Sequence, residues 1–209
     1  MNFPVLFYIS LLVVIVTVLV GGVHYKYLSR PLRILEWLIV INILEVGVQW
    51  ILISLHVHNL WTMHYFTIIE LAFIVLMYSS WIKQRYSRLI LFFVLAGFSI
   101  LWIVSKFTFE PLSIADDGTA TISKILQIIF STYLLLIVVK ESNIIWTDDP
   151  RLWIAAGVII YSAGTLFWVA FFNKMLEVSP KRLLQSLSYN WILMIISNLF
   201  YTRGFLCKK

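Results

Sequence analysis

LEWLIVINILEVGVQWILISL (residues 35–55) and MHYFTIIELAFIVLMYSSWI (residues 63–82) are two long apolar stretches joined by a short link. Each is close to the roughly 20 residues that an α-helix needs to cross a hydrocarbon core of about 30 Å. A backbone in lipid must satisfy its own hydrogen bonds, and a helix does so within one segment. The two stretches therefore predict a transmembrane helical hairpin in an all-α fold.

The whole chain has the composition of a membrane protein. Of its 209 residues, 61 % are hydrophobic and 12 % are charged, whereas soluble domains have roughly 45–50 % apolar and about 25 % charged residues. We expect one integral membrane domain over residues 1–209, with the lipid bilayer as its surroundings. The net charge of +6 does not predict nucleic-acid binding, because the Lys and Arg residues sit in short loops and at helix ends.

Five further segments approach the length of a membrane span. With the hairpin they predict a polytopic bundle of seven transmembrane helices. We expect Gly21 and Gly22 to end the first helix, and Asp149 to cap the sixth with Pro150 at its first position. The fifth segment begins beside Lys124. The seven segments are Pro4–Val20, Leu35–Leu55, Met63–Ile82, Leu89–Ser105, Ile122–Val139, Leu152–Phe172 and Leu183–Tyr201.

The basic residues predict the orientation, because cytoplasmic loops are enriched in Lys and Arg. With the N-terminus outside, eleven of the sixteen fall on the cytoplasmic side and five on the outer side. This distribution predicts an N-out, C-in arrangement. The longest loop is expected from about Lys106 to Thr121, so any chemistry must lie between the helices or at their ends.

Two carboxyl groups lie near the middle of the predicted hairpin. Asn42, Glu45, Gln49 and His56 follow at spacings of three, four and seven, which places them on one helical face. Glu70 lies at a similar depth in the next segment. A carboxyl at this depth is costly and normally faces the bundle interior. We find no Lys or Arg at that depth, and therefore expect at least one of the two carboxyls to be protonated at neutral pH.

These carboxyls have two interpretations. One is a proton- or cation-responsive site, or a polar pocket for a small ligand; the other is hydrogen bonding that holds helices together. Four more polar side chains, Gln127, Tyr161, Asn190 and Asn198, would line a central polar cavity together with Asn42, Gln49 and the carboxyls. Each of these side chains taken alone is typical of an ordinary contact between helices.

Three histidines cluster near the turn of the hairpin. His56 and His58 could present two nitrogens to a metal, and His64 with Glu70 could complete a site. Histidine also titrates near neutral pH, so the cluster could sense external pH. The spacing matches no strong metal motif, and solvent-exposed loop histidines are the competing interpretation. We expect no cofactor, and the absence of protease, hydrolase and phosphate-binding motifs argues against an enzyme.

A motif near the sixth segment carries a family resemblance. Asp149-Pro150-Arg151-Leu152-Trp153-Ile154 continues through Gly157 and Tyr161 to Gly164, and a polar last segment with Asn190 and Asn198 follows. The pattern resembles small bacterial seven-helix proteins and the seven-helix sensor modules found ahead of histidine kinases. The resemblance implies a bacterial inner membrane. Only Arg203 to Lys209 follow the last segment, so signalling would require a separate cytoplasmic or membrane partner protein.

Four functions remain open from the sequence. The first is a sensor or accessory signalling module that responds to a small ligand, ion or lipid and couples to a partner. The second is a small-solute or proton-coupled transporter that uses Glu45 and Glu70, for which we expect a homo-oligomer. The third is an intramembrane lipid-modifying enzyme with the carboxyls as acid and base. The fourth is a structural subunit of a membrane assembly.

Overall fold

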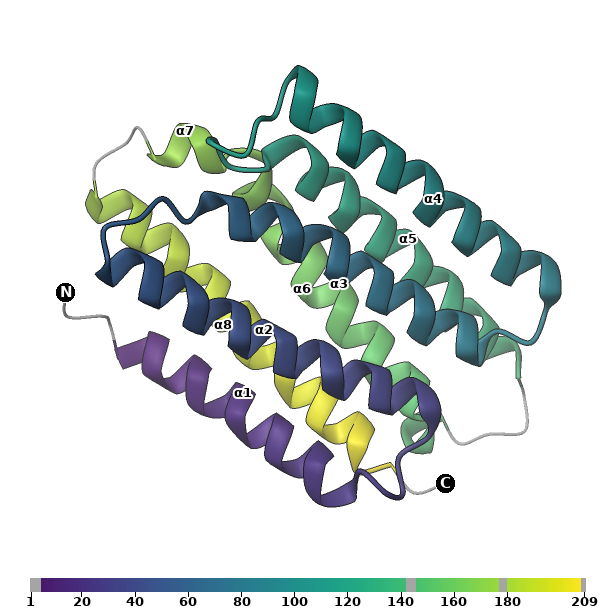
Figure 1. Ribbon diagram of the computed structural model, residues 1–209. Helices are drawn as coiled ribbons and strands as arrows, with labels where there is room; N and C mark the ends of the chain where they lie inside the picture. The colour runs from purple at the N-terminus through teal and green to yellow at the C-terminus, as the bar shows by residue number, and fades with distance from the viewer. Residues whose placement is uncertain (1–4, 142–145, 177–179, 208–209) are drawn as a thin grey trace.

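The chain is an all-helical bundle in a computed structural model that describes residues 5–141, 146–176 and 180–207, with side chains omitted for 175–186. The described residues contain no strand. The long helices run alternately up and down, so the two termini lie at opposite ends of the bundle (Figure 1). The elements are α1 (Val5–His24), α2 (Arg30–Ser54), α3 (Leu60–Trp81), α4 (Arg85–Thr108), α5 (Asp117–Lys140), η1 (Trp146–Asp148), α6 (Pro150–Ala170), α7 (Phe172–Leu176) and α8 (Pro180–Phe205).

Six helices form a closed ring. Neighbours pack in the order α1, α2, α3, α5, α6, α8, and α8 returns to pack on α1. Helix α4 lies outside the ring against α3 and α5 (Figure 1). We call the end of the bundle where α1 begins the N-side, and the end where α8 finishes the C-side. The ring has an interior that polar side chains can line without meeting lipid.

Six helices are long and apolar enough to cross a membrane: α1 to α6. Large apolar side chains cover the outer surface, including Phe93 at 74 % exposed and Phe107 at 86 % exposed on α4. A soluble protein would hide such side chains, whereas lipid solvates them. The chain is therefore a helical membrane protein. Helix α8, the least apolar of the predicted segments, is not among the six described helices that meet this criterion.

The helix ends follow local chemistry, with one prediction confirmed and one wrong. Asp149 caps α6, and its carboxylate accepts a hydrogen bond from the Arg151 N–H at 2.8 Å. Gly21 and Gly22 do not end α1, which continues to His24. A Cβ at Gly21 would lie 1.9 Å from the Glu36 carboxyl of α2, so Gly21 allows a close approach instead. Pro4 of the first predicted segment lies outside the described residues.

Several helices extend further than the apolar runs predicted. Helix α4 continues to Thr108 and α5 begins at Asp117, which shortens the longest predicted loop to residues 109–116. The polar and charged residues at these helix ends contribute little hydropathy, but their backbones still satisfy helical hydrogen bonds. As a result Lys124 lies two turns inside α5.

The C-side half of the ring is filled by a tightly packed apolar core. Leu71, Val75, Leu134 and Ile154 come from three different ring helices and have 0 % exposure. Tyr78 is also fully buried, and its hydroxyl pairs with that of Ser131 at 2.7 Å. This core separates the N-side half of the interior from a hollow at the C-side end of the bundle.

Candidate functional site

The N-side half of the ring encloses a cavity of about 450 Å³, which we call the large cavity. All six ring helices contribute to its lining, from their N-side halves or their middles. Its walls are mostly apolar, with a few charged and amide groups. This combination of an apolar wall and a small number of polar groups is typical of small-molecule sites.

A second cavity of about 60 Å³ adjoins it nearer the middle of the ring; we call it the small cavity. The two cavities share the lining residues Asn42, Phe66, Glu70, Tyr161 and Met194. The small cavity is the more polar of the two relative to its size, because amide and hydroxyl groups from α5, α6 and α8 surround it.

The structure brings all eight polar residues singled out in the sequence to these two cavities. Six of them line the large cavity: Asn42, Glu45, Gln49, Glu70, Tyr161 and Asn190. Gln127 and Asn198 line the small cavity. The spacing on α2 places three of these side chains on one face, and that face turns into the ring.

Glu70 forms a buried ion pair with Lys124 at the base of the large cavity. The Lys124 Nζ lies 2.8 Å from both carboxylate oxygens, and the two side chains are only 9 % and 11 % exposed. The ammonium group also lies 4.7 Å from the centre of the Tyr161 ring. The inference that no cation reaches this depth is therefore wrong. The depth of Lys124 was underestimated because α5 begins five residues earlier than predicted.

Hydrogen bonds extend this ion pair toward α6. The Gln127 amide donates to Glu70 at 3.0 Å, and its carbonyl oxygen accepts from the Ser162 hydroxyl at 2.7 Å. Each side chain in this hydrogen-bonded series has a partner, as buried polar groups require. The series fixes Glu70 and Lys124 in one geometry and links α3, α5 and α6.

Glu45 and Asp116 face the large cavity without a cation. One carboxylate oxygen of Glu45 accepts hydrogen bonds from Gln49 and Thr62. Asp116, directly before α5, accepts from the Thr67 hydroxyl. Burial raises the pKa of Asp116 despite that hydrogen bond. Both groups thus carry a desolvation cost that the described residues do not fully offset.

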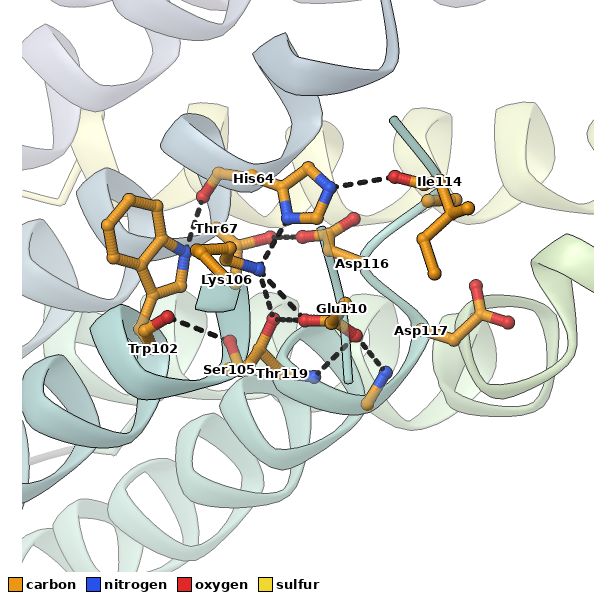
Figure 2. Close-up of polar contacts among 12 residues, drawn as sticks. His64, Thr67, Trp102, Ser105, Lys106, Glu110, Ile114, Asp116, Asp117 and Thr119 are labelled. Atoms are coloured by element: carbon orange, nitrogen blue, oxygen red, sulfur yellow. Dashed lines mark hydrogen bonds and ion pairs between the residues drawn. The ribbon is translucent and has the colours of Figure 1, made fainter. Parts of the chain in front are cut away.

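A second polar network lies beside the cavity on the N-side (Figure 2). Lys106 of α4 pairs with Glu110 at 2.9 Å, and Glu110 also accepts from the Gly118 N–H at 2.7 Å and from Thr119. Burial alone would raise the pKa of Glu110, but these donors and the Lys106 charge hold it below its usual range. The network ties the 109–116 loop to α4 and α5.

His64 belongs to this network. Its Nδ1 accepts from Lys106, and its Nε2 donates to the Ile114 carbonyl oxygen at 2.8 Å (Figure 2). A carbonyl oxygen can only accept, so Nε2 is the donor to Ile114, and Nδ1 faces the Lys106 ammonium. Both ring nitrogens are occupied, so His64 has no lone pair free for a metal.

The other two histidines have structural contacts. His58 donates from Nε2 to the Ser113 carbonyl oxygen at 3.0 Å. His56 has φ 55°, and the N–H groups of His56 and Val57 bond back to Ile53 and Leu52, a common way to end a helix. In the described part of the chain, no group of three His, Cys, Asp or Glu residues is placed to hold a metal.

Sequence reasoning missed several residues of the site. Asp116 lies in a loop, and a single sequence contains no signal that the loop folds back over the ring. Lys124 could have been found, because it lies three residues before Gln127 and shares its helical face. The apolar residues Trp50 and Trp168 line the large cavity, but their types are equally common at membrane interfaces.

No family model, curated protein or solved structure matches this chain. The functional argument therefore depends on the cavities and the side chains that line them.

Proposed function

We propose that the chain is a membrane-embedded sensor module that binds a small ligand in the large cavity and passes the bound state to a partner protein. The observation that carries the proposal is a cavity confined to one half of the ring, above a packed apolar core. A site that a packed apolar core bounds on one side suits binding better than passage. The two carboxyls predicted as a site both line this cavity.

In this proposal the bundle has seven spans, with its N-side outside the cell and its C-side in the cytoplasm. The excess of Lys and Arg at the C-side supports this orientation. Helix α8 supplies the seventh span, because its 26 residues extend about 39 Å at 1.5 Å per residue. The membrane is the bacterial inner membrane, and the ligand comes from the external medium.

The ring supports coupling between the two ends. A ligand in the large cavity touches all six ring helices, so its binding changes the packing of the whole ring. At the C-side end, residues of the same helices and their connections surround a hollow of about 1230 Å³ lined by charged side chains, among them Lys26, Lys83, Glu141 and Arg151. A cytoplasmic partner with complementary charge would bind at this hollow, and its binding would depend on how the ring helices pack.

A transporter is the second candidate, and the small cavity favours it. Polar groups continue from Glu70 through Gln127 and Ser162 to Asn198, halfway along the ring. Transport would require the apolar core below this point to open, and we would then expect a homo-oligomer. An enzyme with two carboxyls as acid and base is less favoured, because Lys124 already engages Glu70.

The test begins with a screen for small compounds that raise the unfolding temperature of the purified chain in detergent. The proposal predicts that Gln49→Leu and Asn42→Leu abolish this stabilisation, while Phe107→Leu on the lipid-facing surface leaves it unchanged. A radiolabelled stabilising compound should bind to proteoliposomes and not cross them. Accumulation inside the vesicles would establish the transporter instead, and stabilisation unaffected by both cavity variants would rule out the cavity as the site.

A further inference from the structure

The large cavity has an excess of acidic groups. Its described lining contains the carboxyls of Glu45, Glu70, Asp116 and Asp117, but Lys124 is the only cationic side chain among them. Lys124 is fully engaged by Glu70, at 2.8 Å to each oxygen. The cavity therefore has no free positive charge to attract an anion, and it keeps two carboxyl groups that are not paired with a cation.

Asp117 is used by the fold, whereas Glu45 and Asp116 are not neutralised. The Asp117 carboxylate accepts from the Asn173 N–H at 3.1 Å and so fixes the start of α7. Glu45 uses one oxygen for Gln49 and Thr62, and its other oxygen accepts no hydrogen bond from a described residue. Neither Glu45 nor Asp116 is in an ion pair in the described part of the chain.

Unpartnered amide oxygens add to the acceptors. Asn198 is 6 % exposed and lines the small cavity, and its Oδ1 has no hydrogen-bond partner among the described residues. On the lining of the large cavity, the Asn190 Oδ1 is likewise a buried acceptor without a partner among the described residues, and the Trp168 Nε1–H is a buried donor without one. Buried acceptors without donors are costly, and they call for a ligand that brings N–H groups.

The walls of the large cavity favour a ligand that has an apolar part besides its N–H groups. Phe66, Trp168 and Trp191 line it together with aliphatic side chains, and Trp50 stacks on Phe7 at one edge. Aromatic faces attract organic cations, and apolar walls favour a ligand with a hydrocarbon body. A bare metal ion would make no use of these walls.

We propose that the ligand is an organic ammonium ion with an apolar body, whose N–H groups are held by Glu45 and Asp116 while its body lies against the aromatic wall. This inference rests on the proposed function, since it names the class of ligand that the sensor binds. Glu45 and Asp116 reach the same cavity from α2 and from the loop before α5, so the cation would join two sides of the ring.

The test compares three probes that share one body: 2-phenylethylammonium, 2-phenylethanol and phenylacetate. Isothermal titration calorimetry on the full chain in detergent should show the ammonium probe binding at least about tenfold tighter than the alcohol, and phenylacetate binding weakest. Glu45→Gln and Asp116→Asn should each weaken the ammonium probe roughly tenfold and leave the alcohol unchanged. Retained binding of the alcohol shows that each variant is folded. Asp148→Asn, an exposed carboxyl at the C-side, is the matched control.

Equal affinity for the ammonium probe and the alcohol, or a preference for phenylacetate, would overturn the cation assignment while the cavity remains a binding site. The cation assignment would also be overturned if none of the three probes binds while a thiol reagent still labels Met63→Cys in the cavity. If the cavity admits neither probe nor reagent, the proposed function fails as well.

Discussion

The ion pair between Glu70 and Lys124 decides which charges remain available in the ring. Two opposite charges this deeply buried repay their desolvation only when the geometry is good. Here both carboxylate oxygens lie 2.8 Å from the ammonium, and Gln127 adds a hydrogen bond. The pair therefore forms a fixed floor of the large cavity without net charge, and Glu45 and Asp116 are the carboxyls left without a cation.

Removing one partner of this pair should be much worse than removing both. Lys124→Met leaves Glu70 buried and uncompensated, and we expect a loss of about 3–5 kcal/mol in the free energy of unfolding. Glu70→Gln added to Lys124→Met should recover most of that loss. Unfolding of the four proteins in a double-mutant cycle measures this. Losses that simply add would mean that the two side chains do not interact.

Glu110 should make the fold sensitive to acid. Its pKa is held below its usual range, so the folded state favours the ionised carboxylate. That contribution to stability is present above the pKa of a glutamate in the unfolded chain, about 4.3. It is lost as the pH falls through the lower pKa of the folded state. Thermal unfolding between about pH 6 and pH 3 should show this loss in the natural chain and a smaller one in Glu110→Gln.

Asp148→Asn is the control for this experiment, because the Asp148 carboxyl is exposed and forms no ion pair with another described residue. It should retain the full acid-dependent loss. If Glu110→Gln and the natural chain lose stability in parallel, the network in Figure 2 does not hold Glu110 ionised.

Residue-level prediction succeeded where helical periodicity decides the answer. The spacing of Asn42, Glu45 and Gln49 places them on one face whatever the neighbouring helices do. The prediction was wrong for His56, which lies beyond the end of α2 at Ser54. It missed Lys124, although its helical face is that of Gln127, and it failed for Asp116 and for the start of α5. Those depend on capping and packing, which one sequence does not reveal.

At the scale of elements, glycines set the distance between α6 and α8. A Cβ at Gly157 would lie 2.6 Å from the Tyr201 ring, and one at Gly164 would lie 2.5 Å from Leu193. Small residues allow this close approach of membrane helices. Helices α1 to α6 were predictable because each is an apolar run, and α8 is less apolar. Helix α7, at five residues, is too short to leave a periodic pattern.

Gly157→Ala should separate α6 from α8. The added methyl group meets an aromatic ring that cannot move aside easily, so we expect a loss of about 1–3 kcal/mol in unfolding free energy. Gly97→Ala on α4 is the matched control, because nothing lies within 4 Å of its added Cβ. It should be neutral or stabilising by up to about 1 kcal/mol, through better helix propensity. Equal effects at both positions would contradict the close packing.

At the scale of the whole molecule, closure of the ring brings polar residues that are far apart in the sequence to one cavity. Hydropathy predicts how many helices there are and roughly where they lie, but it does not predict that α8 closes on α1 or that α4 stays outside. The large cavity depends on that closure, since all six ring helices line it. Apolar packing in the C-side half then bounds this cavity.

The most direct test of this account is thiol labelling at two methionines of α3, in a Cys207→Ser background. Met63 lines the large cavity, whereas Met77 is 1 % exposed in the apolar core. A membrane-impermeant maleimide added to the N-side of oriented vesicles should label Met63→Cys and leave Met77→Cys unlabelled. Labelling of neither position, or of both equally, would contradict a one-sided cavity.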